Sequence, residues 1–214
     1  MKKEQLKKFN IAMAVLLLFA VWTVILRIVD VQGIGPRESS VGFATINAWF
    51  HKLTGVNMWL YTVTDWMGLV PVAVGFGFAI LGLFQWIKRK RIWKVDFSIL
   101  ILGVFYIVVL ASYLFFEEFA INYRPVLING YLEASYPSST TLLVLTVMPT
   151  ASLQLRSRIK CTALRNSIIY AINAFVAFMV IGRLLSGVHW LTDIVGGILL
   201  SAGLVMLYDA AVNR

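Results

Sequence analysis

Residues 11–26 read IAMAVLLLFAVWTVIL, an uninterrupted apolar run that decides the fold of the chain. A helix needs roughly 20 mainly apolar residues to cross the hydrocarbon core of a bilayer. Similar runs recur, so the pattern predicts six transmembrane helices at residues 10–29, 59–87, 97–116, 139–155, 166–185 and 191–210. The composition agrees, with 60% hydrophobic residues, 14% charged residues and a mean hydropathy of +0.83. We therefore expect an all-α, polytopic membrane protein in which residues 1–214 form a single six-span domain.

The first run is longer than the apolar region of about 7–15 residues in a secretory signal, so we expect it to be retained. The basic residues indicate the orientation of the spans. Of the 19, 14 lie before the first span, after the second, after the fourth or at the C-terminus: Lys2, Lys3, Lys7, Lys8, Lys88, Arg89, Lys90, Arg91, Lys94, Arg156, Arg158, Lys160, Arg165 and Arg214. With a cytoplasmic N-terminus all 14 face the cytoplasm, as the positive-inside rule requires. We thus expect both termini inside the cell membrane, and we interpret the net charge of +9 as a topology signal rather than as nucleic-acid binding.

This topology leaves residues 30–58, 117–138 and 186–189 on the outer face. Residues 39–55 carry apolar side chains close to helical spacing, which predicts an interfacial helix on that face. Pro71 and Pro149 fall within spans and predict kinks. The single Cys161 lies in a basic inner loop, so no internal disulfide is possible.

Ionisable residues at the mouth of a membrane bundle are costly and are functional candidates. Here they are Glu117, Glu118, Arg124, Arg183, His189 and Asp193. His189 and Asp193 are four residues apart at the start of the sixth span, so the carboxylate can accept the N–H of one imidazole nitrogen and leave the other as a nucleophile or base. Arg124 and Arg183 carry planar guanidinium groups suited to phosphate oxygens.

Each feature also has a plain structural interpretation. A His/Asp pair can be only a structural hydrogen bond, and an arginine at a span end can be only a headgroup anchor. The predicted topology, however, brings these side chains and the hydroxyl-rich stretch PSST at residues 137–140 to one side of the membrane. Together they predict an anion site at the outer leaflet.

Three short motifs carry a resemblance. Arg124 and Pro125 give RP within residues 117–125, Pro137 and Ser138 give PS within residues 137–140, and residues 182–193 hold R-x5-H-x3-D. In this order and on this face they resemble the signature motifs of the type 2 phosphatidic acid phosphatase family. The resemblance implies a helical membrane enzyme that removes phosphate from lipid phosphates or diphosphates without a metal or another cofactor.

The resemblance also implies roles for individual residues. His189 would attack phosphorus and form a phosphohistidine, while Asp193 would orient its imidazole ring. Arg124 and Arg183 would hold the non-bridging oxygens. Ser138 would contribute its hydroxyl or backbone N–H, and its neighbours Ser139 and Thr140 complete the phosphate-binding segment. The physical interpretation agrees, because phosphoryl transfer depends mostly on positioning and charge neutralisation.

Four positions depart from the family pattern. Glu117 occupies the position of the family's lysine, Ser139 that of a glycine, Thr140 that of the histidine of the second motif, and Gly182 that of a serine. The second-motif histidine protonates the leaving group in the family, which Thr140 cannot do at neutral pH. A diphosphate needs this acid least, because its leaving phosphate has a last pKa of only about 6. The departures therefore favour a lipid diphosphate, such as an isoprenoid carrier, as substrate. Alternatively, a buried Glu117 or Glu118 replaces the acid.

Two other functions stay open. The same site could transfer a headgroup between lipids, or it could bind or transport a lipid phosphate without turnover. The PSST stretch itself predicts a helix start at which Ser138 or Ser139 caps the fourth span, with the positive end of the helix as a phosphate seat.

Several residues have weaker claims. Asp65 is an intramembrane carboxylate that would pair with Arg27 or line a substrate entrance. His51 is expected to be an interfacial side chain, and Asn122 and Glu133 could position a headgroup or a water molecule.

Overall fold

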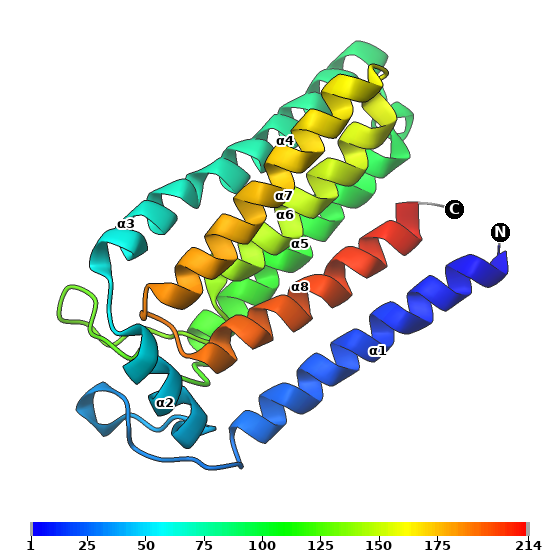
Figure 1. Cartoon of the computed structure of the whole chain (residues 1–214). Coiled ribbons are helices and arrows are strands. Elements are labelled where there is room, and N and C mark those ends of the chain that lie inside the picture. Colours follow the sequence, from blue (N-terminus) through cyan, green and yellow to red (C-terminus); the bar gives the residue numbers. More distant parts are fainter. Residues whose placement is uncertain (1, 213–214) are drawn as a thin grey trace.

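The structure is a computed structural model that describes residues 2–212, so the predicted inner position of Arg214 lies outside the described residues. Its helices are, in chain order, α1 (Lys2–Leu26), the short 3-10 turn η1 (Pro36–Glu38), α2 (Ala44–Thr54), α3 (Met58–Met67), α4 (Leu69–Arg89), the turn η2 (Ile92–Lys94), α5 (Phe97–Glu118), α6 (Ser139–Arg158), α7 (Thr162–Leu185) and α8 (Leu191–Val212). The long helices form a bundle in which the first and last described residues lie at the same end (Figure 1).

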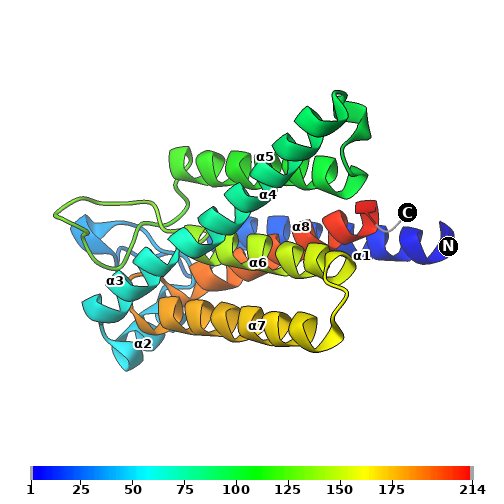
Figure 2. The ribbon, with the colours of Figure 1, turned by 90° about the horizontal axis from the view of Figure 1, so that it is seen from above.

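The multi-pass membrane class is confirmed. Among the described residues, five helices are long and apolar enough to cross a membrane: Lys3–Leu26, Met58–Arg89, Phe97–Glu118, Thr162–Leu185 and Leu191–Val212. The fourth predicted span, residues 139–155, is helical as α6 but does not meet that criterion, so the six-span count stays a prediction. The reason is the location of α6, which packs against α4, α5, α7 and α8 and therefore exposes little surface to lipid (Figure 2).

Hydroxyl side chains in α6 explain its lower hydropathy. Thr146 Oγ1 donates to the Leu142 carbonyl at 2.7 Å, and Thr150 Oγ1 donates to the Thr146 carbonyl at 2.8 Å. A hydroxyl that bonds its own helix backbone is satisfied without a partner from another helix. The helix also runs through Pro149 without being divided.

The second predicted span is divided close to the predicted kink. α3 ends at Met67, Gly68 makes a turn, and α4 begins at Leu69. Pro71 lacks the N–H that would bond the Met67 carbonyl, so the helix ladder is already interrupted there. Gly68 keeps right-handed helical dihedrals, so α3 runs on from α4 in nearly the same direction (Figure 2). α3 packs against α7, whereas α4 packs against α6.

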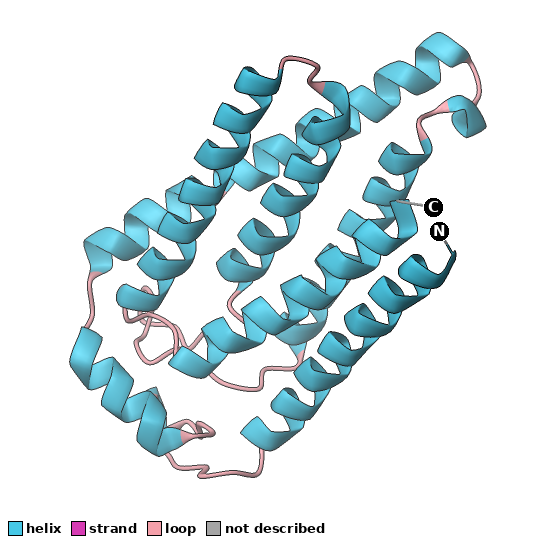
Figure 3. Cartoon of the chain, turned by 45° about the vertical axis from the view of Figure 1, so that its right-hand side comes forward, coloured by secondary structure: helices cyan, strands magenta, loops and turns pink. Residues whose placement is uncertain are grey.

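The predicted interfacial helix is α2, which lies across the end of the bundle away from the two chain ends (Figure 3). Asn47, fully buried, fastens it to the start of α8: its Nδ2 donates to Thr192 Oγ1 at 2.9 Å and to the Gly42 carbonyl at 2.8 Å. The outer side of α2 exposes Trp49 and Leu53. This is the amphipathic placement expected for a helix at a membrane surface.

Polar side chains also tie the opposite end together. Asp96 accepts hydrogen bonds from Gln85 at 2.9 Å, Arg89 at 2.9 Å and Arg158 at 3.1 Å, which links α4, the start of α5 and the end of α6. The Gln85 amide, followed by the two guanidinium groups, lowers the pKa of the Asp96 carboxyl. Polar contacts therefore fix the bundle at both of its ends.

Candidate active site

Two loops and two helix starts meet at the α2 end of the bundle. The long connection between α5 and α6 folds back on itself, with the Ser135 N–H donating to the Asn122 carbonyl at 2.9 Å. Trp190 joins this connection to the loop before α8, because its indole Nε1 donates to the Tyr123 carbonyl at 2.7 Å. The three motif segments predicted from the sequence are thereby brought together.

His189 and Asp193 form the centre of the site. The His189 Nδ1 atom lies 3.7 Å from Asp193 Oδ2, and both side chains are almost completely buried. His189 precedes α8 and only Asp193 lies within it, so the pair spans a helix start rather than one helix face as predicted. Asp193 Oδ2 also accepts the Trp190 backbone N–H at 2.9 Å, an N-terminal capping bond that fixes the carboxylate.

Asp193 is held on its other side as well. Its Oδ1 accepts a hydrogen bond from Asn122 Nδ2 at 3.1 Å, and its backbone carbonyl accepts the Ser138 N–H at 3.1 Å. Each of these partners comes from a different motif segment. Asp193 therefore positions the imidazole and also locks the start of α6 onto the start of α8.

Arg124 settles which histidine nitrogen carries the proton. Its Nη1 lies 3.2 Å from His189 Nε2. A guanidinium group can only donate hydrogen bonds, so Nε2 accepts with its lone pair and the ring proton belongs on Nδ1, facing Asp193. In this tautomer Nδ1 faces the carboxylate across 3.7 Å without a hydrogen bond, and Nε2 keeps the lone pair that a nucleophile needs.

The surroundings of His189 keep its ring neutral. Burial, then the positive charges of Arg124 and Arg183, lower the pKa of His189 well below its ordinary value, against a smaller opposing effect of the Ser135 backbone. A neutral imidazole has the free lone pair that a nucleophile needs.

Arg183 approaches the same site from α7. Its side chain is 1% exposed and lies 3.4 Å from Asp65 Oδ1, with its Nη1 3.3 Å from Thr64 Oγ1. The guanidinium carbon lies 4.8 Å from the centre of the Tyr61 ring. The predicted alternative of an Asp65–Arg27 pair is wrong, because Asp65 pairs with Arg183 instead.

The close packing of α3 on α7 explains one departure from the family pattern. A Cβ atom on Gly182 would lie 2.7 Å from Thr64 Cγ2, which is closer than side-chain atoms approach. Gly182 therefore replaces the family serine at the point where α3 presses on α7. This contact places Thr64 and Asp65 beside Arg183.

The PSST stretch begins α6 as expected, but one predicted detail is wrong. Ser138 occupies the N-cap position, yet its hydroxyl makes no capping bond and instead accepts from Thr141 Oγ1 at 3.0 Å. Ser138 is fully buried, whereas Ser139 and Thr140 are half-buried. The first N–H groups of α6 thus lack a side-chain cap, which suits a helix start that receives an anion.

Among the described residues, the two glutamates make no ion pair with this cluster, although Glu117 lines a small cavity beside Pro137 and Ser139. Glu117 and Glu118 end α5 and are exposed, and among residues 2–212 neither makes an ion pair with Arg124, Arg183 or His189. The nearest acidic partner of Arg124 is Glu133, whose Oε2 lies 2.9 Å from Arg124 Nε. The burial assumed for a replacement acid at Glu117 or Glu118 is therefore absent.

An apolar groove of about 610 Å³ leads away from the site between α4, α5 and α6. Asp65, Ser139 and Thr140 line one part of it. Its apolar lining includes Pro71, Val72, Phe76, Val109, Leu110, Leu143 and Val147. The groove therefore joins the polar helix start to the lipid-facing interior of the bundle.

Sequence reasoning missed Asn47 and Thr64, which hold Thr192 and Arg183 in place, and it gave Asn122 and Glu133 only minor roles. The sole signal was polarity within apolar segments. His51, expected only at the interface, hydrogen-bonds through Nε2 to the Gly187 carbonyl at 3.1 Å and packs on Trp190. No group of three His, Cys, Asp or Glu side chains within residues 2–212 is placed to hold a metal ion.

Fold and site together define a multi-pass helical membrane protein with a buried His/Asp/Arg cluster at one end of its bundle. A family model described as the PAP2 superfamily matches residues 115–213, which contain Arg124, Ser138, Arg183, His189 and Asp193. This region of the chain therefore matches the PAP2 superfamily, as the motif resemblance predicted.

A solved structure resembles the whole fold. It is the crystal structure of the first transmembrane PAP2 type phosphatidylglycerolphosphate phosphatase from Bacillus subtilis, with a TM-score of 0.58 and 17% sequence identity over 93% of each chain. At this identity the similarity concerns the fold. Among curated proteins, none matches the sequence significantly.

Proposed function

We propose that the protein is a membrane-bound lipid phosphatase that releases phosphate through a phosphohistidine at His189, and that a lipid diphosphate is its preferred substrate. The observation that carries the proposal is the buried His189 ring, with Nδ1 facing Asp193 and the Nε2 lone pair facing Arg124. The match to the PAP2 superfamily supports a lipid phosphate as substrate class.

The first step follows from this geometry. A phosphate oxygen takes the Arg124 hydrogen bond now made to Nε2, which frees the nitrogen lone pair to attack phosphorus. The N–P bond forms as the bond to the leaving oxygen breaks, and Asp193 stabilises the positive charge that develops on the imidazole. Arg183 and the free N–H groups of α6 offset the charge on the equatorial oxygens. Water then attacks the phosphohistidine, which releases inorganic phosphate and restores His189.

The groove supports a lipid rather than a soluble phosphate ester. It starts at Ser139 and Thr140, beside the helix start proposed to hold phosphate, and continues along apolar side chains of α4, α5 and α6. A phosphate at the start of α6 would therefore leave its hydrocarbon chain facing this groove, where apolar surface is removed from water.

The leaving group decides between lipid phosphates and diphosphates. Thr140 lines the groove where the leaving oxygen would depart, and a threonine cannot supply a proton at neutral pH. Glu117 and Glu118 are exposed, so burial does not prepare either as the acid. A diphosphate expels a lipid monophosphate that departs as an anion, whereas a monophosphate must expel a far more basic alkoxide.

We also propose that the site faces the outer leaflet. The basic clusters at the start of α1, the end of α4, the end of α6 and the start of α7 lie at the bundle end that carries both termini, opposite the start of α8 (Figure 1). The positive-inside rule then places this end in the cytoplasm and the site outside.

A non-catalytic lipid-phosphate binder is the second candidate, favoured by the threonine at position 140, which cannot protonate a leaving group. The decisive assay measures phosphate release by purified protein in lipid nanodiscs from an isoprenoid diphosphate, phosphatidic acid and phosphatidylglycerol phosphate. We expect release that is fastest with the diphosphate and abolished by His189→Ala. Binding of all three lipids without phosphate release would contradict the proposed phosphatase activity and would support a non-catalytic lipid-phosphate binder.

Trapping the intermediate assigns the nucleophile. The chain has two histidines, so rapid acid-free quenching with a labelled terminal phosphate should label wild type and His51→Gln but not His189→Ala. Label that survives in His189→Ala would contradict the mechanism. Product analysis with an added acceptor lipid separates hydrolysis from headgroup transfer, because only a transferase would move label to the acceptor.

A further inference from the structure

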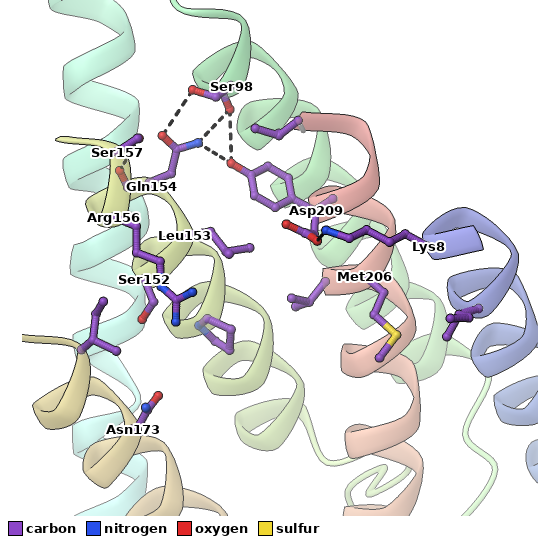
Figure 4. A pocket seen from close by; sticks show the side chains of 16 residues that line it. Lys8, Ser98, Ser152, Leu153, Gln154, Arg156, Ser157, Asn173, Met206 and Asp209 are labelled. Carbon is purple, nitrogen blue, oxygen red and sulfur yellow. Dashed lines mark hydrogen bonds and ion pairs between the residues drawn. The ribbon is translucent and has the colours of Figure 1, made fainter. Parts of the chain in front are cut away.

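A second cavity lies at the end of the bundle away from His189. It measures about 880 Å³ and lies between α6, α7 and α8, with Lys8 and Ile11 of α1 at its edge (Figure 4). It exists because α7 packs mainly on α6 and touches α8 little, which leaves α6 as the floor between two walls. An adjoining hollow of about 530 Å³ shares Arg156, Ile169 and Asn173 with it.

Ser152 places an unsatisfied hydroxyl in the floor of this cavity. The residue is 7% exposed, and its Oγ has no hydrogen-bond partner within the described part of the chain. Other hydroxyls of α6 behave differently, since Thr146 and Thr150 bond carbonyls of their own helix. Buried polar groups are nearly always hydrogen-bonded, so we expect the Ser152 hydroxyl to bond a partner from outside the protein.

Asn173 adds a polar amide to the opposite wall. It lies eleven residues beyond the start of α7 at Thr162, which is about 16 Å into the span at 1.5 Å per residue. No hydrogen bond joins its side chain to any of residues 2–212, and in Figure 4 it projects from α7 toward the cavity. An amide at this depth in an apolar helix is expensive unless a polar group reaches it.

Two positive charges stand above these polar groups. Arg156 is exposed and Arg165 half-buried, both line the adjoining hollow, and neither has an ion-pair partner in the part of the chain that the structure describes. Lys8, the other cation that lines the cavity, is neutralised, since its Nζ lies 2.8 Å from Asp209 Oδ2. The uncompensated charge at this end of the cavity therefore belongs to Arg156 and Arg165.

We propose that this cavity binds one phospholipid with an anionic headgroup, taken from the leaflet opposite to the candidate active site. Its phosphate lies between Arg156 and Arg165, its glycerol and ester oxygens bond Ser152 and Asn173, and its chains follow Leu153, Val205 and Met206. A lipid fits better than a protein partner, because Ser152 and Asn173 lie farther into the helix bundle than Arg156 and Arg165, where lipid is already present. Lipid binding in this cavity does not depend on phosphatase activity.

The test compares lipid retention by the full chain. Protein purified in a mild detergent is mixed with phosphatidylglycerol or phosphatidylcholine of identical chains, and bound lipid is counted by native mass spectrometry. We expect wild type to retain one phosphatidylglycerol at least tenfold more strongly than phosphatidylcholine. Arg156→Gln/Arg165→Gln should lose this preference, whereas Lys90→Gln/Arg91→Gln removes the same charge from the α4–α5 connection and should keep it.

Two more variants and a competition experiment separate a bound phospholipid from a soluble anion or a second protein copy. Asn173→Leu suits a membrane helix and should weaken phosphatidylglycerol retention severalfold, while His189→Ala should leave it unchanged. Equal retention by the two double variants would overturn the proposal. So would competition by inorganic phosphate or glycerol phosphate as effective as that by phosphatidylglycerol, which indicates a soluble anion, or a dimer that dissociates in Arg156→Gln/Arg165→Gln, which indicates a second copy in the cavity.

Discussion

The most direct test of the His189 geometry is Asp193→Asn, which keeps the shape of the side chain and removes its charge. Asp193 is completely buried and faces donors alone: the Trp190 N–H, the Asn122 amide and the Nδ1–H of His189. An asparagine offers one acceptor and one donor, so its NH2 group faces at least one donor. The least costly response is to move the histidine proton from Nδ1 to Nε2, where it faces Arg124 and blocks the nucleophilic lone pair.

The size of the effect follows from what is lost. In the wrong tautomer Nε2 cannot attack, and the imidazolium formed in the transition state loses its counter-charge. Charge-assisted positioning of this kind is worth about 3–5 kcal/mol, or a rate factor of about 10²–10⁴. The buried mismatch should also destabilise the fold by about 1–3 kcal/mol.

The assay is single-turnover phosphate release in nanodiscs with saturating lipid, accompanied by a thermal unfolding scan. The matched control is Asp209→Asn, the same substitution on the same helix at the far end of the bundle, which should keep wild-type release. If folded Asp193→Asn releases phosphate within threefold of wild type, Asp193 does not orient the nucleophile and the proposed mechanism is wrong.

Three further predictions concern single positions. The pKa of His189 is lowered in the folded protein, so below about pH 6.5 only the unfolded chain takes up a proton at this residue. The unfolding temperature should therefore fall as the pH decreases from that value. The fall should be smaller in His189→Gln, which cannot take up this proton. Gly187→Ala should destabilise the protein more than Gly130→Ala, as measured by thermal unfolding, since both glycines have positive φ but only at Gly187 would a Cβ clash, 1.9 Å from the Gly55 carbonyl oxygen. Thr140→His should raise phosphate release from a lipid monophosphate relative to a diphosphate by about tenfold or more, as general-acid catalysis contributes about 10²–10⁴ where geometry is good; an unchanged ratio would count against the leaving-group argument.

The fold could be predicted from the sequence wherever one physical requirement determines the local structure. Apolar runs must be helical in a bilayer because their backbone groups have no water to bond, which is why the predicted spans match helices so closely. The amphipathic pattern of residues 39–55 likewise predicted α2. The same rule fails for α6, where hydropathy alone does not identify a span because neighbouring helices rather than lipid surround it.

The site could be predicted where its interacting residues lie close together along the chain. His189 and Asp193 are close along the chain, so their contact could be predicted, although the helix begins only after His189. The Asp65–Arg183 pair joins residues 118 positions apart, and no periodicity encodes such a contact. It arises from the close packing of α3 on α7 at Gly182, which is a property of the assembled bundle.

These long-range contacts also explain how an arginine of the site can exchange one anionic partner for another. Arg124 faces Glu133 and Arg183 faces Asp65, so each guanidinium already has a carboxylate in place of phosphate oxygens. The side chains of Glu133 and Asp65 are 37% and 55% exposed, whereas Asp193 is fully buried. Glu133 lies in the connection between α5 and α6, so it can return to water when phosphate takes Arg124, at little desolvation cost, while Asp193 has no such exit. The difference in exposure separates the carboxylate that a phosphate would replace from the one that must stay with His189.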